Sequence, residues 1–189
     1  MRENNKESLT QKVVLAGKYG FWYKDLKNLF EKENWDFFLL DKSYPESREL
    51  FRIQNINVLL YAVDFRQDLI HGTDSNKKLL DFLRLAQENH VERVYLLSTV
   101  EAIPVGDKII NQMAHIAENI LLDWSSSAGI AATVIRLPEI YGLGADSCDG
   151  WVARWMNALY DGAVTYDIPA GEGKRCFLYV DDAVYGIYK

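Results

Sequence analysis

The sequence of 189 residues has few cysteines, no excess of basic charge and no long apolar run. Its two cysteines, Cys148 and Cys176, lack the spacing of metal ligands, and we expect free thiols in a reducing compartment. The net charge of −6 argues against a role on nucleic acid or on a membrane surface. No apolar stretch approaches the roughly 20 residues that cross a bilayer. We therefore expect a cytoplasmic protein without a metal centre.

The ends of the expected domain follow from composition. The first residues, Met1–Gln11, are polar and lack the apolar core of a signal peptide, so we expect a flexible leader. Residues 12–189 are expected to fold as one domain, because a chain of this length buries about 70% of its unfolded surface. Hydrophobic residues at 49% and charged residues at 25% are typical of a soluble globular protein.

The segment Lys12–Asp41 has the pattern of a strand, a glycine turn, a helix and a second strand. The apolar run Val13–Ala16 predicts a strand that is buried on both faces of a parallel sheet. Gly17 and Gly20 interrupt this run, and apolar residues at helical spacing follow them. A second apolar run then ends on Asp41.

This pattern favours a turn that binds a dinucleotide. Glycines let the backbone approach a pyrophosphate, and the helix N-terminus offers free N–H groups. Asp41 follows Gly20 by 21 positions (41 − 20) and is placed to accept hydrogen bonds from a ribose diol. Tyr23 stands where the third glycine of the pattern would fall, which predicts weaker binding. An ordinary turn that binds nothing remains the alternative.

Apolar runs and helical periods alternate along the rest of the chain. Further strands are expected at 58–62, 94–97 and 133–137, and helices at 47–54, 76–89 and 108–124. The longest of these helices has an apolar stripe of Ile109, Met113, Ile116, Ile120 and Trp124. The alternation predicts an α/β fold with a doubly wound parallel sheet. Ligands of such sheets bind beyond the carboxyl ends of the strands, which here are Gly17, Asp41, Ala62 and Thr99.

The pattern loosens after Pro138, where glycines become frequent. An amphipathic helix is expected at 151–160, and strands at 164–168 and 177–180. These elements, from about 145 to 189, predict an incomplete small C-terminal lobe within the same domain.

Six segments, in order and spacing, resemble the extended short-chain dehydrogenase/reductase family, the NAD-dependent epimerases and dehydratases of nucleotide sugars. They are VVLAGKYG, LLYAV, VYLLST, AENILLDW, VIRLPEIYGLG and GEGKRCFLYVDD. The resemblance implies a Rossmann-type NAD(P)-binding fold, with NAD as the cofactor, NADP as the alternative and a nucleotide sugar as a further ligand. It implies cofactor contacts from Gly17, Gly20, Phe21, Asp41, Ala62 and Leu137.

The catalytic positions of this family depart from its pattern. The family uses a Tyr and a Lys four residues apart on the long helix, and a Ser or Thr after the fourth strand. The Lys lies four residues before the Glu of an Ala-Glu pair, here Ala117-Glu118. Counting back places Ala114 at the Lys position and Ile110 at the Tyr position, and neither side chain can carry a proton. Thr99 is the one catalytic position retained.

His115, Tyr61 and Tyr141 are candidates to replace the missing pair. His115 is turned by about 100° from Ala114 around the helix. Tyr61 and Tyr141 belong to segments that line the expected cleft, and both are interpreted as packing residues.

Three functions are compatible with these residues. The favoured one is an NAD(P)-binding relative that is catalytically impaired, a pseudoenzyme acting as a sensor, scaffold or partner subunit. The second is an active epimerase, dehydratase or reductase with rearranged catalytic groups, and the third is a structural module without a cofactor. The resemblance also implies a homodimer through the helices 76–89 and 108–124. The second helix is apolar on more than one side and needs cover from more than the sheet.

Overall fold

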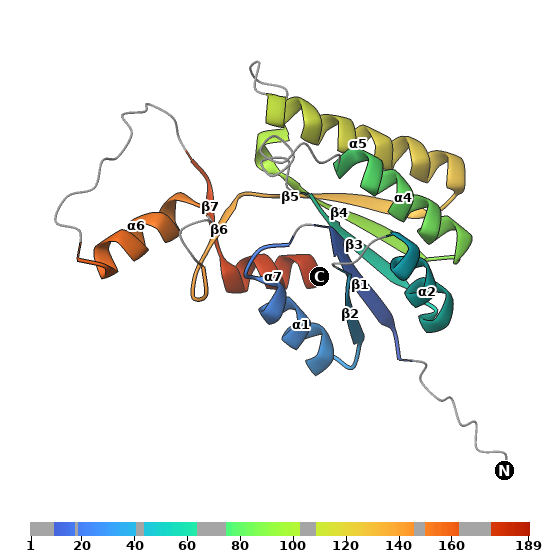
Figure 1. Ribbon diagram of the computed structural model, residues 1–189, viewed down its shortest axis with the longest axis horizontal. Coiled ribbons are helices and arrows are strands. Elements are labelled where there is room, and N and C mark those ends of the chain that lie inside the picture. Colours follow the sequence, from blue (N-terminus) through green and yellow to red (C-terminus); the bar gives the residue numbers. More distant parts are fainter. Residues whose placement is uncertain are drawn as a thin grey trace, which may run out of the picture.

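The fold is built around one parallel sheet of five strands in the order β2-β1-β3-β4-β5 (Figure 1). A computed structural model describes residues 10–17, 19–40, 44–63, 75–102, 109–145, 150–162 and 175–189. The strands are β1 (Lys12–Gly17), β2 (Asp36–Leu40), β3 (Val58–Ala62), β4 (Arg93–Thr99) and β5 (Ala131–Leu137). All four strand pairings in this sheet are parallel, which confirms the predicted doubly wound α/β fold.

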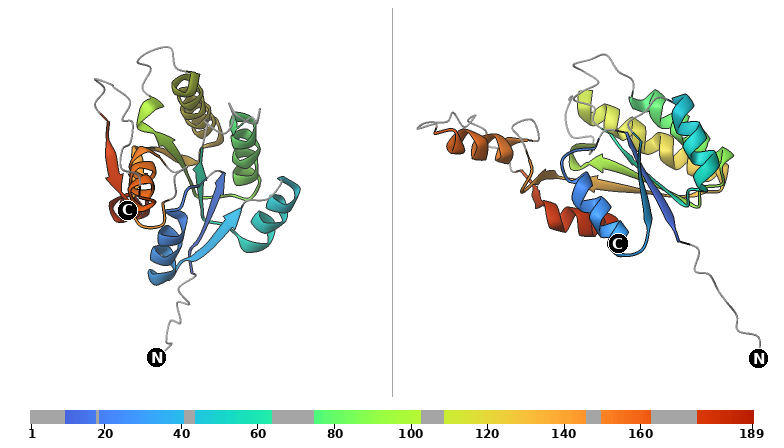
Figure 2. Two further views of the ribbon diagram at one scale, coloured as in Figure 1. Left: turned by 60° about the vertical axis from the view of Figure 1, so that its left-hand side comes forward. Right: turned by 60° about the horizontal axis from the view of Figure 1, so that its bottom comes forward.

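Helices cover both faces of the sheet. They are α1 (Tyr23–Lys32), α2 (Tyr44–Gln54), α4 (Ser75–Glu88), α5 (Ile109–Ala128), α6 (Trp151–Tyr160) and α7 (Val180–Tyr188), with a short 3-10 turn η1 (Val100–Ala102). Side chains on β1 alternate between the two faces, because successive residues of a strand point to opposite sides. Val13 and Leu15 pack in one buried cluster with α1 and α7, whereas Val14 packs in the other with α2, α4 and α5. The result is a three-layer sandwich (Figures 1 and 2).

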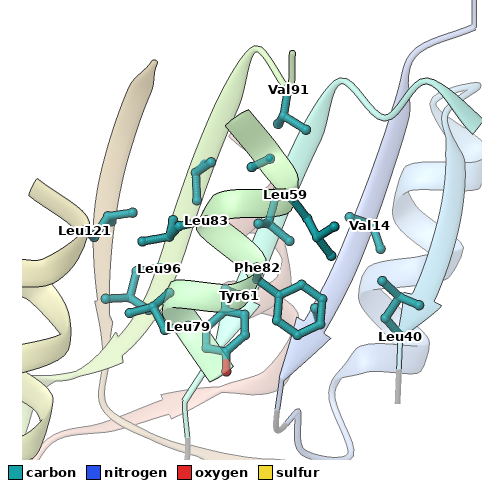
Figure 3. Packing of buried hydrophobic residues seen from close by; sticks show 14 of the residues in the cluster. Val14, Leu40, Leu59, Tyr61, Leu79, Phe82, Leu83, Val91, Leu96 and Leu121 are labelled. Atoms are coloured by element: carbon teal, nitrogen blue, oxygen red, sulfur yellow. The ribbon is translucent and has the colours of Figure 1, made fainter. Parts of the chain in front are cut away.

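The cluster under α2, α4 and α5 is the larger of the two. Leu79 and Leu83 of α4 lie over Leu59 and Tyr61 of β3, and Leu121 of α5 closes one side (Figure 3). All five side chains are at most 1% exposed. Burying an aliphatic side chain of this size contributes about 1.5–3 kcal/mol. Packing on β3 therefore stabilises the central part of the sheet.

The buried face of α5 differs from the predicted stripe. Ile109 and Ile116, which belong to that stripe, are 59% and 49% exposed. The residues that face the sheet are Asn111, Ala114, Ala117, Glu118 and Leu121. Hydrophobicity alone favoured the isoleucines, but alanines let the helix axis approach the sheet closely. As a result, Ile109 and Ile116 remain exposed on the side of α5 that faces away from the sheet.

The last helix, α7, was not predicted, because Val180 was assigned to the preceding strand. Val180, Ala183, Val184 and Ile187 are buried, and they follow one another at the spacing of a helix face. The aromatic ring of Tyr188 packs edge-on against Phe30 of α1, with ring centroids 5.2 Å apart. The C-terminal end of the described chain thus returns to the main sheet.

The expected small lobe consists of two short strands and α6. Strands β6 (Glu139–Tyr141) and β7 (Phe177–Tyr179) pair in parallel as a second sheet, and β6 was not predicted. Helix α6 has the predicted bounds and projects away from the main sheet (Figure 1; right view of Figure 2). The expected strand at 164–168 and the leader up to residue 9 lie outside the described residues. In the part of the chain that is described, no helix is long and apolar enough to cross a membrane.

Gly17 is the residue of β1 that tolerates substitution least. Its φ is +89°, and a Cβ atom added there would lie 2.1 Å from the carbonyl oxygen of Ala62. We predict that Gly17→Ala lowers the free energy of unfolding by about 2 kcal/mol or more, because strain at positive φ adds to a clash with backbone. Urea denaturation measures this loss.

Gly129→Ala is the matched control. Gly129 also has a positive φ, +68°, but nothing lies within 4 Å of an added Cβ. Its substitution is expected to cost only about 1 kcal/mol. Equal losses for the two variants would contradict the role assigned to the Ala62 carbonyl.

Candidate functional site

Four of the predicted site residues end neighbouring strands at one edge of the sheet. Gly17 and Ala62 are paired in register at the ends of β1 and β3, and Thr99 and Leu137 at the ends of β4 and β5. The chain passes to one side of β1 to form β2 and then to the other side to form β3. This is the topological switch point at which open parallel sheets bind ligands. Asp41 directly follows β2 but lies outside the described residues.

The turn from β1 to α1 leaves the start of the helix open to an anion. The carbonyl of Gly20 accepts a hydrogen bond from the backbone N–H of Tyr23 at 3.3 Å. Trp22 occupies the N-cap position and makes no side-chain cap, so its side chain satisfies none of the first N–H groups of α1. Free N–H groups together with the helix dipole favour a phosphate at this position, although the carboxylate of Asp25 lies in the same turn.

Aromatic rings surround this turn. The ring of Tyr23, where a third glycine was expected, packs on the ring of Tyr19 with centroids 5.0 Å apart. Phe21 lies beside Gly144, since a Cβ added at Gly144 would be 3.8 Å from the Phe21 ring. The aromatic turn therefore connects the main sheet to the loop after β6. Its two glycines and open helix start still fit the diphosphate of a dinucleotide.

The two substituted catalytic positions lie in the first turns of α5. Ile110 is in the first turn, and Ala114, one turn later, has no exposed surface. The methyl group of Ala114 can neither carry a proton nor hydrogen-bond a ribose. Thr99 is half-buried at the end of β4.

The two tyrosines considered as substitutes are engaged in packing. Tyr61 is 1% exposed, its hydroxyl donates to the backbone carbonyl of Ser75 at 3.4 Å, and its ring contacts Phe82. The ring of Tyr141 packs edge-on against Tyr179 with centroids 5.6 Å apart. Both contacts agree with the interpretation of these residues from the sequence.

A buried polar link that sequence reasoning missed joins α5 to β4 and β5. The carboxylate of Glu118 accepts hydrogen bonds from the Ser98 hydroxyl at 2.8 Å and from Arg136 Nε and Nη2 at 2.9 and 2.6 Å. Ser98 and Arg136 are paired in register on β4 and β5, next to Thr99 and Leu137. A glutamate on an otherwise apolar buried face was the available signal, because such a charge requires a partner.

The environment of Glu118 keeps its carboxyl ionised. Burial acts to raise its pKa, but the hydrogen bonds from Arg136 and Ser98, with the charges of Arg136 and His115, outweigh burial. The net result is a pKa below the ordinary value of 4.5. The link therefore stabilises the folded chain at neutral pH, and this contribution is lost as the pH falls through the lowered pKa.

The small lobe carries two cations on one aromatic ring. The guanidinium carbons of Arg154 and Arg175 lie 5.1 and 5.0 Å from the centroid of the Trp151 ring. Glu139 Oε1 accepts from the backbone N–H groups of Trp151 and Val152 and so caps the start of α6. Both arginines are exposed, so their charges face solvent. Within the described ranges, no group of three or more His, Cys, Asp or Glu side chains could hold a metal ion.

Comparison with known proteins gives one family and a set of similar folds. A family described as "NAD dependent epimerase/dehydratase family" matches residues 75–189. No curated protein sequence matches this chain. The UDP-glucose 4-epimerase of Thermotoga maritima, solved with UDP-glucose, is similar in structure with a TM-score of 0.80 at 15% identity, over 93% of this chain and 71% of that one.

Two further solved structures have the same fold. The UDP-glucose 4-epimerase of Thermus thermophilus in complex with NAD has a TM-score of 0.76 at 15% identity, over 94% of this chain and 73% of that one. MoeE5 in complex with UDP-glucose and NAD has a TM-score of 0.74 at 16% identity, over 94% of this chain and 70% of that one. Identities this low establish the fold alone.

We predict that Arg136→Met lowers the free energy of unfolding by about 2–3 kcal/mol at pH 7, because it leaves the Glu118 carboxylate buried without its cation. The side chain of Glu118 is 4% exposed, whereas that of Arg136 is 41% exposed. Because Arg136 is partly solvated, we expect a smaller loss of stability than for an ion pair that is buried on both sides. The loss should shrink as the pH falls through the lowered pKa of Glu118, where protonation neutralises its carboxylate. Denaturant titrations at several pH values measure both effects.

Arg48→Met is the control. Arg48 pairs with Glu88 at 3.6 Å, and both side chains are well exposed, at 65% and 41%. Such a pair contributes about 0–1 kcal/mol. A loss for Arg136→Met no larger than for Arg48→Met would contradict the stabilising role of the Glu118 link.

Proposed function

The protein belongs to the NAD dependent epimerase/dehydratase family, which matches more than half of the chain, and we propose that it binds NAD without performing the family's hydride transfer. The observation that carries this proposal is the pair of substitutions on α5. Ile110 and Ala114 stand where the resembled family has its proton-handling Tyr and its ribose-binding Lys, and Ala114 is completely buried. Residues that act as a unit do not fail additively, so the loss of both leaves little catalysis.

Binding of NAD is supported by the carboxyl edge of the sheet. The switch point between β1 and β3, the turn Gly17–Gly20 and the uncapped start of α1 provide a place for the diphosphate. Phe21 of the turn and Ala62 at the end of β3 lie next to this place and supply apolar contacts, whereas Leu137 ends β5 and would contact a more distant part of the dinucleotide. When bound, NAD supplies a hydride acceptor. Asp41 accepts hydrogen bonds from the adenosine ribose and disfavours the 2′-phosphate of NADP.

A nucleotide sugar is the second proposed ligand. Arg154 and Arg175 place two positive charges beside the Trp151 ring, at the base of the small lobe. Guanidinium groups bind phosphates through charge-assisted hydrogen bonds, so this cationic surface favours the diphosphate of a nucleotide sugar. The structurally similar epimerase and MoeE5 hold UDP-glucose. A protein that binds both ligands without converting them is suited to act as a sensor, scaffold or partner subunit.

We predict that the protein binds NAD more tightly than NADP in calorimetric titrations. Asp41→Ala should weaken NAD binding by about tenfold, the effect of losing one hydrogen bond to a charged group. Asp36→Ala is the matched control, because Asp36 is an exposed aspartate at the opposite end of the same strand. Binding of neither dinucleotide at millimolar concentration would eliminate this function and favour the structural module.

We also propose a homodimer through α4 and α5. The outward sides of these helices expose large apolar side chains: Leu80 at 47%, Ile109 at 59%, Ile116 at 49% and Leu122 at 48%. Apolar surface that recurs along two adjacent helices is typical of a protein interface. A second copy of the same pair of helices is the simplest cover, since a two-fold axis makes the surface self-complementary.

Light scattering at micromolar concentration is expected to give the mass of a dimer, and Ile116→Glu to give that of a monomer. Met156→Glu on α6 is the control, because Met156 is 62% exposed but lies outside the proposed interface. A monomeric wild-type protein, or a dimer that Met156→Glu disrupts and Ile116→Glu does not, would exclude this interface.

A further inference from the structure

A surface cavity lies between the C-terminal ends of α4 and α5. Gln87 and residues 90–92 line it on the α4 side, and residues 128–130 line it on the α5 side. Its volume of about 540 Å³ is within the range of small-molecule pockets. The loops that line it lead into the first residues of β4 and β5. The α4–α5 cavity, as we call it, therefore lies at the amino edge of the main sheet, opposite the proposed place of NAD.

Both helices direct the negative ends of their dipoles to this cavity. They lie side by side and end at Glu88 and Ala128 (Figure 1). Each is closed by a residue of positive φ that lines the cavity, His90 at +53° and Gly129 at +68°. The C-terminus of a helix carries about half a negative charge. Two such ends at one cavity favour a positively charged ligand.

The ends of α4 and α5 lack the basic side chain that is found at the ends of α1 and α2. Lys32 stands in the last turn of α1 and Arg52 in that of α2, whereas the last turns of α4 and α5, which the structure describes in full, contain none. The last turn of α5 has serines instead. The hydroxyls of Ser125 and Ser127 donate to backbone carbonyls at 2.7 and 2.9 Å but carry no charge. The two dipoles are therefore not compensated by the chain itself.

The charged side chain at the cavity is also acidic. Glu92 is exposed at its rim, and Oε1 of its carboxylate accepts a hydrogen bond from Asn57 Nδ2 at 2.9 Å. This bond fixes the carboxylate in place. Arg93, the next residue, hydrogen-bonds to Tyr95 instead. Among the described residues that line the cavity there is no lysine or arginine, so the charge of Glu92 adds to that of the helix ends.

The wall of the cavity is apolar. Val91 is 2% exposed, and Ile130 is half-buried. A ligand that fits these surroundings has an apolar body and a positively charged group. Alkylammonium and alkylguanidinium ions have both, since their methylene chains pack on apolar surface while the charged group stays at the edge. A metal ion, in contrast, would leave the apolar side chains without contact.

We propose that the α4–α5 cavity binds a small organic cation, an alkyl chain that carries an ammonium or guanidinium group. The chain packs on Val91 and Ile130, and the charged group lies at the carboxylate of Glu92 and the C-terminal ends of the two helices. The site is independent of the proposed binding of NAD, because the two places lie at opposite edges of the sheet. It provides a second ligand, opposite in charge to a dinucleotide, on the helix that carries Ile110 and Ala114.

Titration with pentylammonium, followed by NMR shifts of the backbone N–H groups of Val91 and Gly129, tests this site. We expect saturable binding with a dissociation constant of roughly 1 mM, which lies within the limits for a ligand of this size. The compounds n-pentanol and pentanoate have the same chain without the positive charge and should bind about tenfold more weakly or not at all. No saturable shift with pentylammonium, or an equal affinity for n-pentanol, would overturn the proposal.

Glu92→Gln should weaken pentylammonium binding by about tenfold, because the amide keeps the hydrogen bond from Asn57 but loses the charge. Glu33→Gln is the matched control. Glu33 is also an exposed glutamate that directly follows a helix, but it does not line the cavity. Wild-type affinity in Glu92→Gln, or an equal loss in Glu33→Gln, would contradict the assigned site.

Ala128→Lys is the second variant, because it supplies a cation from the end of α5 itself. It should abolish pentylammonium binding and raise the melting temperature of the ligand-free protein by about 1–3 °C, since the new charge compensates the helix dipoles. Pentylammonium binding that persists in Ala128→Lys would place the ligand elsewhere. A lower melting temperature would show that the cavity does not favour positive charge. Either result would reject the inference without affecting the proposed binding of NAD.

Discussion

Strand β1 is paired on both edges and covered on both faces, and the other elements take their places around it. Its residues Val13–Ala16 have no exposed surface. Because β2 and β3 lie on its two sides, the topological switch point of the sheet falls at Gly17. The close approach of the Ala62 carbonyl explains why this position needs glycine independently of any ligand. The same residue thus serves the packing of the sheet and the geometry of the turn.

Helix α5 is held on the sheet by a contact that involves neither Ile110 nor Ala114. Glu118 holds the helix on β4 and β5 through Ser98 and Arg136, one turn after the position of Ala114. This contact keeps the first turns of the helix above the carboxyl edge of the sheet. The proposed loss of the family's Lys at Ala114 is compatible with this contact, because Glu118 and not the residue at position 114 holds the helix on the sheet. This is the physical basis of the proposal that the chain binds its cofactor without turning it over.

The extent to which the sequence predicts this structure depends on the kind of residue. The central strands were predicted because β1 and β3 are continuous apolar runs, a pattern that arises from burial on both faces. For α5 the sequence predicted apolar residues on more than one side, and close packing of its alanines decides which side faces the sheet. Helix α7 was missed, since its four buried positions fall in the last ten residues, after a segment that was assigned to a strand.

The candidate site likewise combines residues that the sequence predicted with contacts that it did not predict. Gly17, Ala62, Thr99 and Leu137 were predicted at strand ends, and parallel register brings them to one edge of the sheet. The Glu118 link could not be predicted from the sequence. Whether a polar atom has a partner depends on residues distant in the chain, and periodicity contains no information about them.

The separation of cofactor binding from hydride transfer is tested most directly by incubating the protein with NAD and UDP-glucose. The absorbance of reduced nicotinamide is followed together with product chromatography. We expect both ligands to bind and neither reduced nicotinamide nor a new sugar nucleotide to accumulate. Turnover above about 0.1 per second, near the low end for ordinary enzymes, would contradict this expectation and show that another group has replaced the missing Tyr and Lys.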